Sequence, residues 1–348
     1  IIMEKKFMLT KYFSILLLII ALPLSAQINI DTDQAIHVKS FAKSDIFADV
    51  YSINIGQGAD KPFSLIKPYT TRDNKLLLSC WPSELYLYDL EGKFIKRIHS
   101  GDQLPVNTYD RNKNYFYLEV LDGGVPTWYG IDLKIGEVVT RLPKPSIYEK
   151  QIVNFKRTGA DEYVCFVNNQ SGNDSVFVVF FDGKGKVKCT IPEERTYKKN
   201  GEDNPYFQGQ FYDYDGKHYF KELLWGTTVY EIGDCKLIPH IQFDLGSKTP
   251  NYAYRDMPEK NKGTYQLGTV METDTRIYFS YNVNKETFWG YYSKADGKTY
   301  VTKLPSKDKI TDKGESCNFL PAWDSGFETV TAIQSKDKEP VIVVGDLK

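Results

Sequence analysis

The sequence predicts an all-β protein: a six-bladed β-propeller of four-stranded antiparallel blades, closed into a ring by its N- and C-terminal strands. Three observations support this prediction. Apolar and polar residues alternate with a period of two from Gln27 to the end of the chain. Short β-rich runs separated by turns recur as five similar units, spaced roughly 45 to 65 residues apart. No stretch of about a dozen residues or more has a helical period.

The composition fits a folded β protein and argues against nucleic acid as a partner. Hydrophobic residues make up 41% of the chain and aromatic residues 14%, with 25 Tyr and 20 Phe. Aromatic side chains favour the half-buried surface of a strand. The net charge of -1 gives no overall field that would hold a phosphate backbone.

Residues 1–26 have the pattern of a secretory signal. Lys5, Lys6 and Lys11 form a basic start, an apolar run over 12–22 follows, and Ala26 is the predicted cleavage position. The alternative is a membrane anchor, but the run has about ten residues where a span needs about twenty. No cysteine lies near the cut to carry a lipid, and no later segment could cross a bilayer. We expect a periplasmic or secreted protein whose residues 27–348 form one propeller domain.

The clearest repeating unit is a meander early in the chain. Residues 75–80 and 84–89 read as two strands, and residues 93–98 return after a turn. Gly92 supplies the positive φ that this turn requires, and Asp89 can hydrogen-bond within it. One such unit cannot cover both of its own faces, so the set is expected to close into a ring.

Four more units follow the same pattern, and a sixth blade is predicted to be split between the two ends of the chain. Its C-terminal strands are residues 327–333 and 340–344, and its N-terminal part is either residues 35–41 or residues 50–55. Pairing the ends would remove open sheet edges. The four other predicted units comprise residues 114–140, 162–191, 218–243 and 276–304.

The strand pattern over residues 86–98 resembles the blades of six-bladed propellers exported by Bacteroidetes, which are TolB-like or NHL-like. Residues 225–232 resemble another strand of that family, and the signal ending at Ala26 fits such bacteria. Residues 100–105 depart from the family's usual Gly-x-Gly-Pro turn, and the lipid-bearing cysteine of many members is missing. The resemblance implies fold and export and little about chemistry.

The cysteines and histidines do not form a recognisable metal site. The five cysteines have wide, irregular spacings without a Cys-x-x-Cys pair, so one disulfide could form but no pairing is predicted. Cys80 and Cys165 read as small buried residues. His218 and His240 could approach each other within one blade, but solvated or otherwise satisfied histidines are the better interpretation. Residues 110–114 and 213–216 read as turns rather than as calcium loops, and we predict no metal and no cofactor.

No local motif indicates catalysis. The chain has no Gly-x-Ser-x-Gly, and the glycine pair of Gly56 and Gly58 lacks the third glycine of a phosphate cradle. Paired carboxylates for glycoside chemistry are too unspecific to assign among 45 acidic residues.

The five tryptophans are more informative, because an indole can stack on sugars or peptide side chains. Packing between blades is the commoner role for each of them. Trp81 and Trp225 lie at strand ends, where propeller loops gather, and are therefore the two candidate ligand contacts.

Two functions remain open. The first is an exported binding or scaffolding module whose loops recognise an envelope protein, a peptide or a glycan. The second is a periplasmic hydrolase or lyase that acts on a glycan or peptide at the axial pocket.

Overall fold

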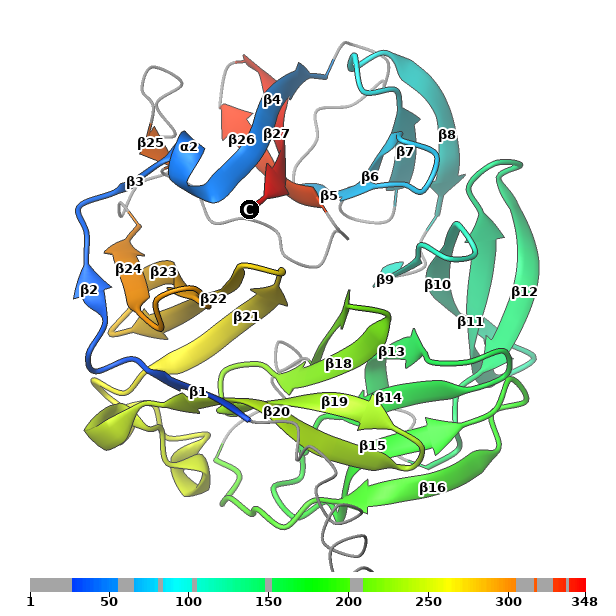
Figure 1. Cartoon of the computed structure of the whole chain (residues 1–348). Coiled ribbons are helices and arrows are strands. Elements are labelled where there is room, and N and C mark those ends of the chain that lie inside the picture. Colours follow the sequence, from blue (N-terminus) through cyan, green and yellow to red (C-terminus); the bar gives the residue numbers. More distant parts are fainter. Residues whose placement is uncertain are drawn as a thin grey trace, which may run out of the picture.

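The computed structural model confirms an all-β propeller fold with its sheets arranged in a ring (Figure 1). It describes residues 27–55, 66–80, 84–101, 105–147, 152–200, 209–304, 316–317, 328–335 and 338–348. The predicted signal, residues 1–26, lies outside the described residues. Within them, no helix is long and apolar enough to cross a bilayer.

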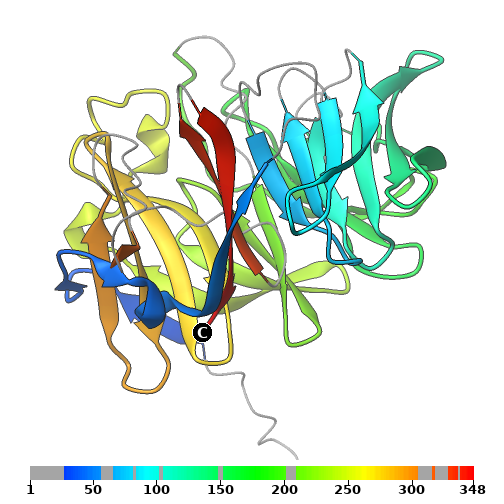
Figure 2. The ribbon, with the colours of Figure 1, turned by 90° about the horizontal axis from the view of Figure 1, so that it is seen from above.

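Five antiparallel meanders, here blades 1 to 5, follow one another along the chain. Figure 2, turned by 90°, shows their strands running between the two ends of the ring. Blade 1 comprises β5 (Ile66–Thr70), β6 (Leu76–Cys80), β7 (Glu84–Tyr88) and β8 (Phe94–Ser100); blade 2 comprises β9 (Pro105–Asp110), β10 (Tyr115–Asp122), β11 (Val125–Asp132) and β12 (Glu137–Pro143); blade 3 comprises β13 (Ile152–Arg157), β14 (Tyr163–Val167), β15 (Val176–Phe181) and β16 (Val187–Pro192). Blade 4 comprises β17 (Gly209–Tyr214), β18 (Lys217–Glu222), β19 (Thr228–Gly233) and β20 (Lys236–Asp244), and blade 5 comprises β21 (Gln266–Glu272), β22 (Arg276–Val283), β23 (Glu286–Ser293) and β24 (Thr299–Lys303).

The first strand of each blade was missing from the units that the sequence predicted. These strands line the centre of the ring, where β13 contacts both β9 and β17, and β17 contacts β21. Their sequences mix polar and apolar residues, as in Pro105–Asp110. A strand with polar residues on both sides gives no period-two signal, which is why the pattern identified only the outer three strands of each blade.

The two ends of the chain meet in a three-stranded sheet, here the closing sheet. Its order is β26 (Glu328–Ser335), β27 (Lys338–Leu347) and β4 (Phe47–Asn54), and β26 contacts β5 of blade 1. Strand β4 pairs antiparallel with β27, with Ser52 opposite Val343. Of the two N-terminal segments predicted to complete a sixth blade, residues 50–55 therefore supply the strand.

Residues 35–41, the other candidate segment for the sixth blade, belong instead to a strap that runs over residues 28–46 across blades 4 and 5. Its strands β1 (Ile28–Asp31) and β2 (Ile36–His37) pair parallel with the outer strands β20 and β24, so both blades gain a fifth strand. Ile30 of β1 is completely buried in the core between these blades. The strap then continues through β3 (Phe41–Ala42), which pairs with β25 (Ser316–Cys317), and the short helix α2 (Lys43–Ile46).

Alternating side chains of each strand pack against opposite neighbours. In β6, Leu76 and Leu78 join the core between blade 1 and the closing sheet, whereas Leu77 joins the core between blades 1 and 2. Trp128 and Trp289 are completely buried between blades, as expected for packing residues. Gly92 has the predicted positive φ (84°), and a Cβ there would lie 2.0 Å from the Asn54 carbonyl oxygen of the closing sheet.

A disulfide joins blades 3 and 4 at their periphery. It links Cys189 of β16 to Cys235, which lies in the turn between β19 and β20. Cys80 and Cys165 are buried free thiols, as predicted, and burial raises the pKa of Cys80 to about 12. A disulfide persists in oxidising compartments, which agrees with a location outside the cytoplasm.

We expect the Cys189→Ser/Cys235→Ser variant to be about 2–4 kcal/mol less stable than the wild type, because the bond constrains the unfolded chain. Urea unfolding, with and without reductant, checks this. Reduction should destabilise the wild type and leave the double variant unchanged; equal midpoints for oxidised and reduced wild type would show that the bond adds no stability.

Candidate functional site

The loops of each blade gather at two ends. The loops between the second and third strands, together with the connections between blades, lie at one end, here the loop face. The hairpins between the first and second and between the third and fourth strands lie at the other end, here the hairpin face. On the loop face, four segments of blades 3 and 4 converge: residues 168–175, residues 193–200, residues 223–227 and residues 245–265.

Arg195 is the centre of this convergence, which we call the loop site. Its Nε and Nη2 donate to the two carboxylate oxygens of Glu193 at 2.9 and 2.6 Å, and its Nη1 donates to Glu222 Oε2 at 2.7 Å. The guanidinium group also contacts two rings, 4.2 Å from the centroid of Tyr252 and 5.1 Å from that of Phe177. Burial lowers the pKa of Arg195, but the bonds to both carboxylates outweigh this and raise it above its usual value.

Arg255 ties the long connection of residues 245–265 to blade 3. It is 4% exposed and follows the 3-10 helix η3 (Tyr252–Tyr254), which comes after a first 3-10 helix, η2 (Gly246–Lys248). Its guanidinium donates to the Tyr252 hydroxyl at 2.9 Å and to Asn168 Oδ1, and stacks on Tyr197 at 5.1 Å. The 3-10 turn η3 thus delivers an arginine into the loop site.

Lys221 and Glu222 place two further titratable groups beneath the loops, at the end of β18. Burial raises the pKa of Glu222, while the charges of Arg195 and Arg255 oppose that rise. Lys221 is fully buried, and its Nζ donates to the main-chain oxygens of Glu222 and Leu267 at 2.8 and 3.2 Å. Burial lowers the pKa of Lys221 to about 7, against the opposing charge of Glu222. Perturbed titratable groups gathered at one place are typical of functional sites.

The two tryptophans predicted as ligand contacts have different outcomes. Trp81 lies outside the described residues. Trp225 does belong to the loop site, but it is 7% exposed and packs edge-on against Tyr252, with 6.1 Å between the ring centroids. The structure therefore places Trp225 behind the site as a support, with the half-buried Tyr252 and Arg195 nearer the surface.

Sequence reasoning missed Arg195, Tyr252 and Arg255. They lie in polar connections that carry no strand pattern, and their partners are far away in the chain. The signal that could have drawn attention to them is an arginine close to tyrosines in the two longest connections between blades, at Arg195–Tyr197 and Tyr252–Arg255.

The histidines of blade 4 have carboxylate partners rather than each other. His218 Nδ1 lies 2.7 Å from Asp213 Oδ1, and Lys156 Nζ contacts Asp213 Oδ2 at 2.6 Å. His240 Nε2 lies 2.7 Å from Glu272 Oε2. Among the described residues, no group of three or more potential ligands could hold a metal.

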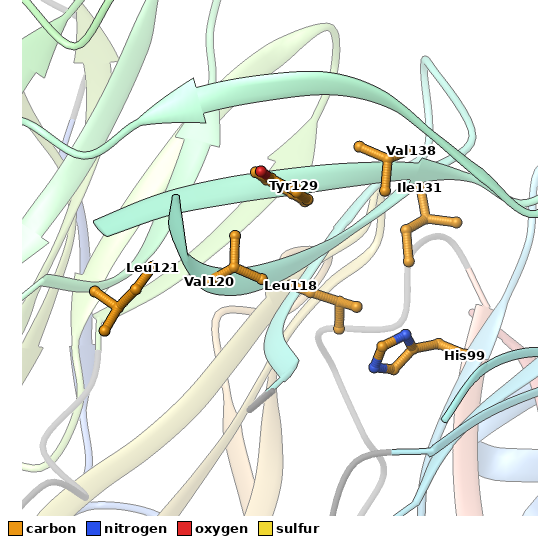
Figure 3. A pocket seen from close by; sticks show the side chains of 7 residues that line it. All are labelled: His99, Leu118, Val120, Leu121, Tyr129, Ile131 and Val138. Atoms are coloured by element: carbon orange, nitrogen blue, oxygen red, sulfur yellow. The ribbon is translucent and has the colours of Figure 1, made fainter. Parts of the chain in front are cut away.

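A hollow of about 320 Å³ opens between blades 1 and 2 (Figure 3). Figure 3 shows the ring of His99 directed from β8 towards Leu118, in a mainly aliphatic lining. Burial lowers the pKa of His99, which favours the neutral imidazole. Leu121 at its edge is 75% exposed, so the hollow is open to solvent. The lining residues are His99, Leu118, Val120, Leu121, Tyr129, Ile131 and Val138.

We expect the stability of the wild type, measured relative to Lys221→Met, to rise with pH between about 7 and 10. Unfolded lysine has a pKa near 10.4, so in this window the unfolded chain holds a proton that the folded chain has lost. The slope is at most about 1.4 kcal/mol per pH unit. Urea unfolding across this range measures it.

Lys217→Met is the matched control, since Lys217 is an exposed lysine at the start of the same strand. A pH-independent difference for Lys221→Met would show that Lys221 keeps its proton in the folded protein.

Comparison with known proteins adds a family and a fold. A family model described as a domain of unknown function, DUF4934, matches residues 129–341, which is more than half of the chain. No curated protein matches the sequence.

Solved structures that this chain resembles are distant in sequence. A Bacteroides fragilis protein, described as a candidate exported protein, is 16% identical over 93% of this chain and 100% of its own, with a TM-score of 0.61. The β-propeller domain of Cps50 from Myceliophthora thermophila is 10% identical over 84% of this chain and 100% of its own, with a TM-score of 0.47. TolB from Acinetobacter baumannii is 12% identical over 81% of this chain and 64% of its own, with a TM-score of 0.40. At these identities the similarity to the first structure shows the fold alone. The chain belongs to the DUF4934 family, in a β-propeller fold.

Proposed function

We propose that this protein is an exported binding or scaffolding propeller that recognises a protein, peptide or glycan through the loop face of blades 3 and 4. Export is supported by the signal pattern of residues 1–26 and by the disulfide between Cys189 and Cys235. The loop face is where four segments meet, and a scaffold that positions loops is a common way to build a binding surface.

We further propose that the closing sheet is the sixth blade of the ring. Its strand order, with β26 near the axis and β4 outermost, repeats the inner-to-outer order of blades 1 to 5. Its Ile342 and Val344 pack against blade 1, as each blade packs against the next.

The observation that carries the binding proposal is the fixed geometry of Arg195 and Tyr252. Two carboxylates and two rings hold the Arg195 guanidinium, and Arg255 holds the Tyr252 hydroxyl. Arginine and tyrosine are enriched among the residues that dominate binding energy, and side chains that are already ordered lose little entropy on association.

A second candidate function is a hydrolase or lyase, and the pair of Asp213 and His218 favours it. A carboxylate on Nδ1 orients the imidazole and leaves Nε2 as the atom for proton transfer, the arrangement of a general base. The pair lies where β17 and β18 meet on the hairpin face, beside the innermost strand of blade 3. Turnover of glycan or peptide substrates that is lost in His218→Ala would favour this function.

The binding proposal is tested by capture followed by direct titration. The mature chain is used as bait in the solubilised envelope of the source bacterium, and each retained molecule is purified and titrated by calorimetry. We expect Arg195→Ala to bind it at least about tenfold more weakly, because the variant loses the arginine contact and leaves Glu193 and Glu222 without the cation that joins them.

Lys188→Ala is the control, because it removes an exposed cation paired with Glu162 in the same blade. Circular dichroism confirms that both variants are folded. A partner that binds Arg195→Ala as tightly as the wild type would contradict a role for the loop site.

A further inference from the structure

The two connections that build the loop site also carry an excess of positive charge at the surface. Over residues 193–200 and 245–265, five lysines are exposed but only two acidic residues are, Glu194 and Glu259. The lysines are Lys198, Lys199, Lys248, Lys260 and Lys262. The whole chain has a net charge of -1, so this surface is opposite in sign to the rest of the molecule.

The other described acidic groups near these connections are engaged or lie at their edge, including the exposed Asp244, which accepts the Gly246 N–H at 2.9 Å. Glu193 and Glu222 are bound to Arg195, and the half-buried Asp256 accepts the Asn200 N–H at 3.2 Å. Asp33 of the strap lies beside Gly246 and marks the outer edge of the lysines. Beneath the surface, the buried Arg255 adds a further positive charge.

The two connections that carry these lysines are bonded to each other, and the second is also bonded within itself. The Asn200 bond to Asp256 joins the first connection to the second. Asn261 Nδ2 donates to the Tyr254 carbonyl at 2.9 Å, which folds the second connection back on itself and brings residues 260–262 beside η3. In Figure 1 this connection is the yellow-green segment with two short coils next to β20 and β1.

Aromatic rings are interspersed with these cations. Tyr254 is 36% exposed, and Lys260 Nζ lies 4.5 Å from the centroid of its ring. Tyr252 is half-buried beneath Arg195. A sugar acid offers a carbon face for such a ring and an anionic group for such a cation in one unit, and a polymer repeats both along its length.

We propose that these two connections bind an anionic polysaccharide, one whose sugar units carry carboxylate or sulfate groups. This inference rests on the proposed function, because it names the partner class for the same loop face. Rim charges of this kind act through long-range attraction, so binding is expected to weaken as salt rises.

Affinity electrophoresis of the mature chain tests the proposal, in gels containing polygalacturonate, a sulfated dextran or, as the neutral arm, unmodified dextran. We expect retardation in an anionic gel and none in the neutral gel. In Lys198→Glu/Lys260→Glu/Lys262→Glu the apparent affinity should fall at least about tenfold.

The control, Lys113→Glu/Lys134→Glu/Lys184→Glu, makes the same change in net charge on exposed lysines of the hairpin face and should bind like the wild type. Retardation in neither anionic gel, or equal loss in both triple variants, would overturn the proposal. So would a captured protein partner that binds the loop-face triple variant normally but not Arg195→Ala; in that case the binding function itself would stand.

Discussion

Each blade of this protein has apolar side chains on both faces of its sheet. The rest of the structure depends on the two neighbouring sheets that bury these faces. Alternate residues of a strand point to opposite faces, so a strand such as β6 contributes to two cores at once. Five clusters of buried side chains lie between successive sheets around the ring. Closure is therefore a condition of stability, and the pairing of β4 with β27 supplies it from the two ends of the chain.

The loop site inherits its order from this ring. Residues of blades 3, 4 and 5 meet there only because the blades are fixed against one another. Asn168 of blade 3 accepts a hydrogen bond from Arg255, which is 87 residues further along the chain. Lys221 of blade 4 donates a hydrogen bond to the Leu267 carbonyl of blade 5. The cost of burying these charges is offset by hydrogen bonds and by ion pairs of opposite sign. A surface built in this way presents Arg195 and Tyr252 in one arrangement.

The sequence predicted those parts of the fold that repeat locally. The three outer strands of each meander, the turn at Gly92 and the burial of Cys80 and Cys165 all follow from short-range patterns. The inner strands did not, because polar residues near the axis blur their alternation. The parallel pairing of β1 and β2 with blades 4 and 5 could not be predicted either, since Ile28 pairs with Ile241 across most of the chain, and residues 35–41 were predicted only as a possible part of the sixth blade.

The loop site was the least predictable part for the same reason. Trp225 was selected because it lies at a strand end, and the structure does place it there. Tyr252 packs against it, however, and leaves the indole buried. Arg195 and Arg255 acquire their roles from partners in other loops. The pairing of Cys189 with Cys235 likewise depends on two blades being adjacent, which an odd set of irregularly spaced cysteines does not specify.

The central claim is that the sheets of a closed ring bury one another's apolar faces. Hydrogen exchange of the Val344→Asp variant, measured by mass spectrometry, tests this claim most directly. Val344 is 1% exposed in the core between the closing sheet and blade 1. We expect the buried aspartate to weaken the whole ring, so that hydrogen exchange becomes faster in every blade, including β15 of blade 3. Faster exchange confined to the closing sheet and blade 1, with β15 protected as in the wild type, would contradict it.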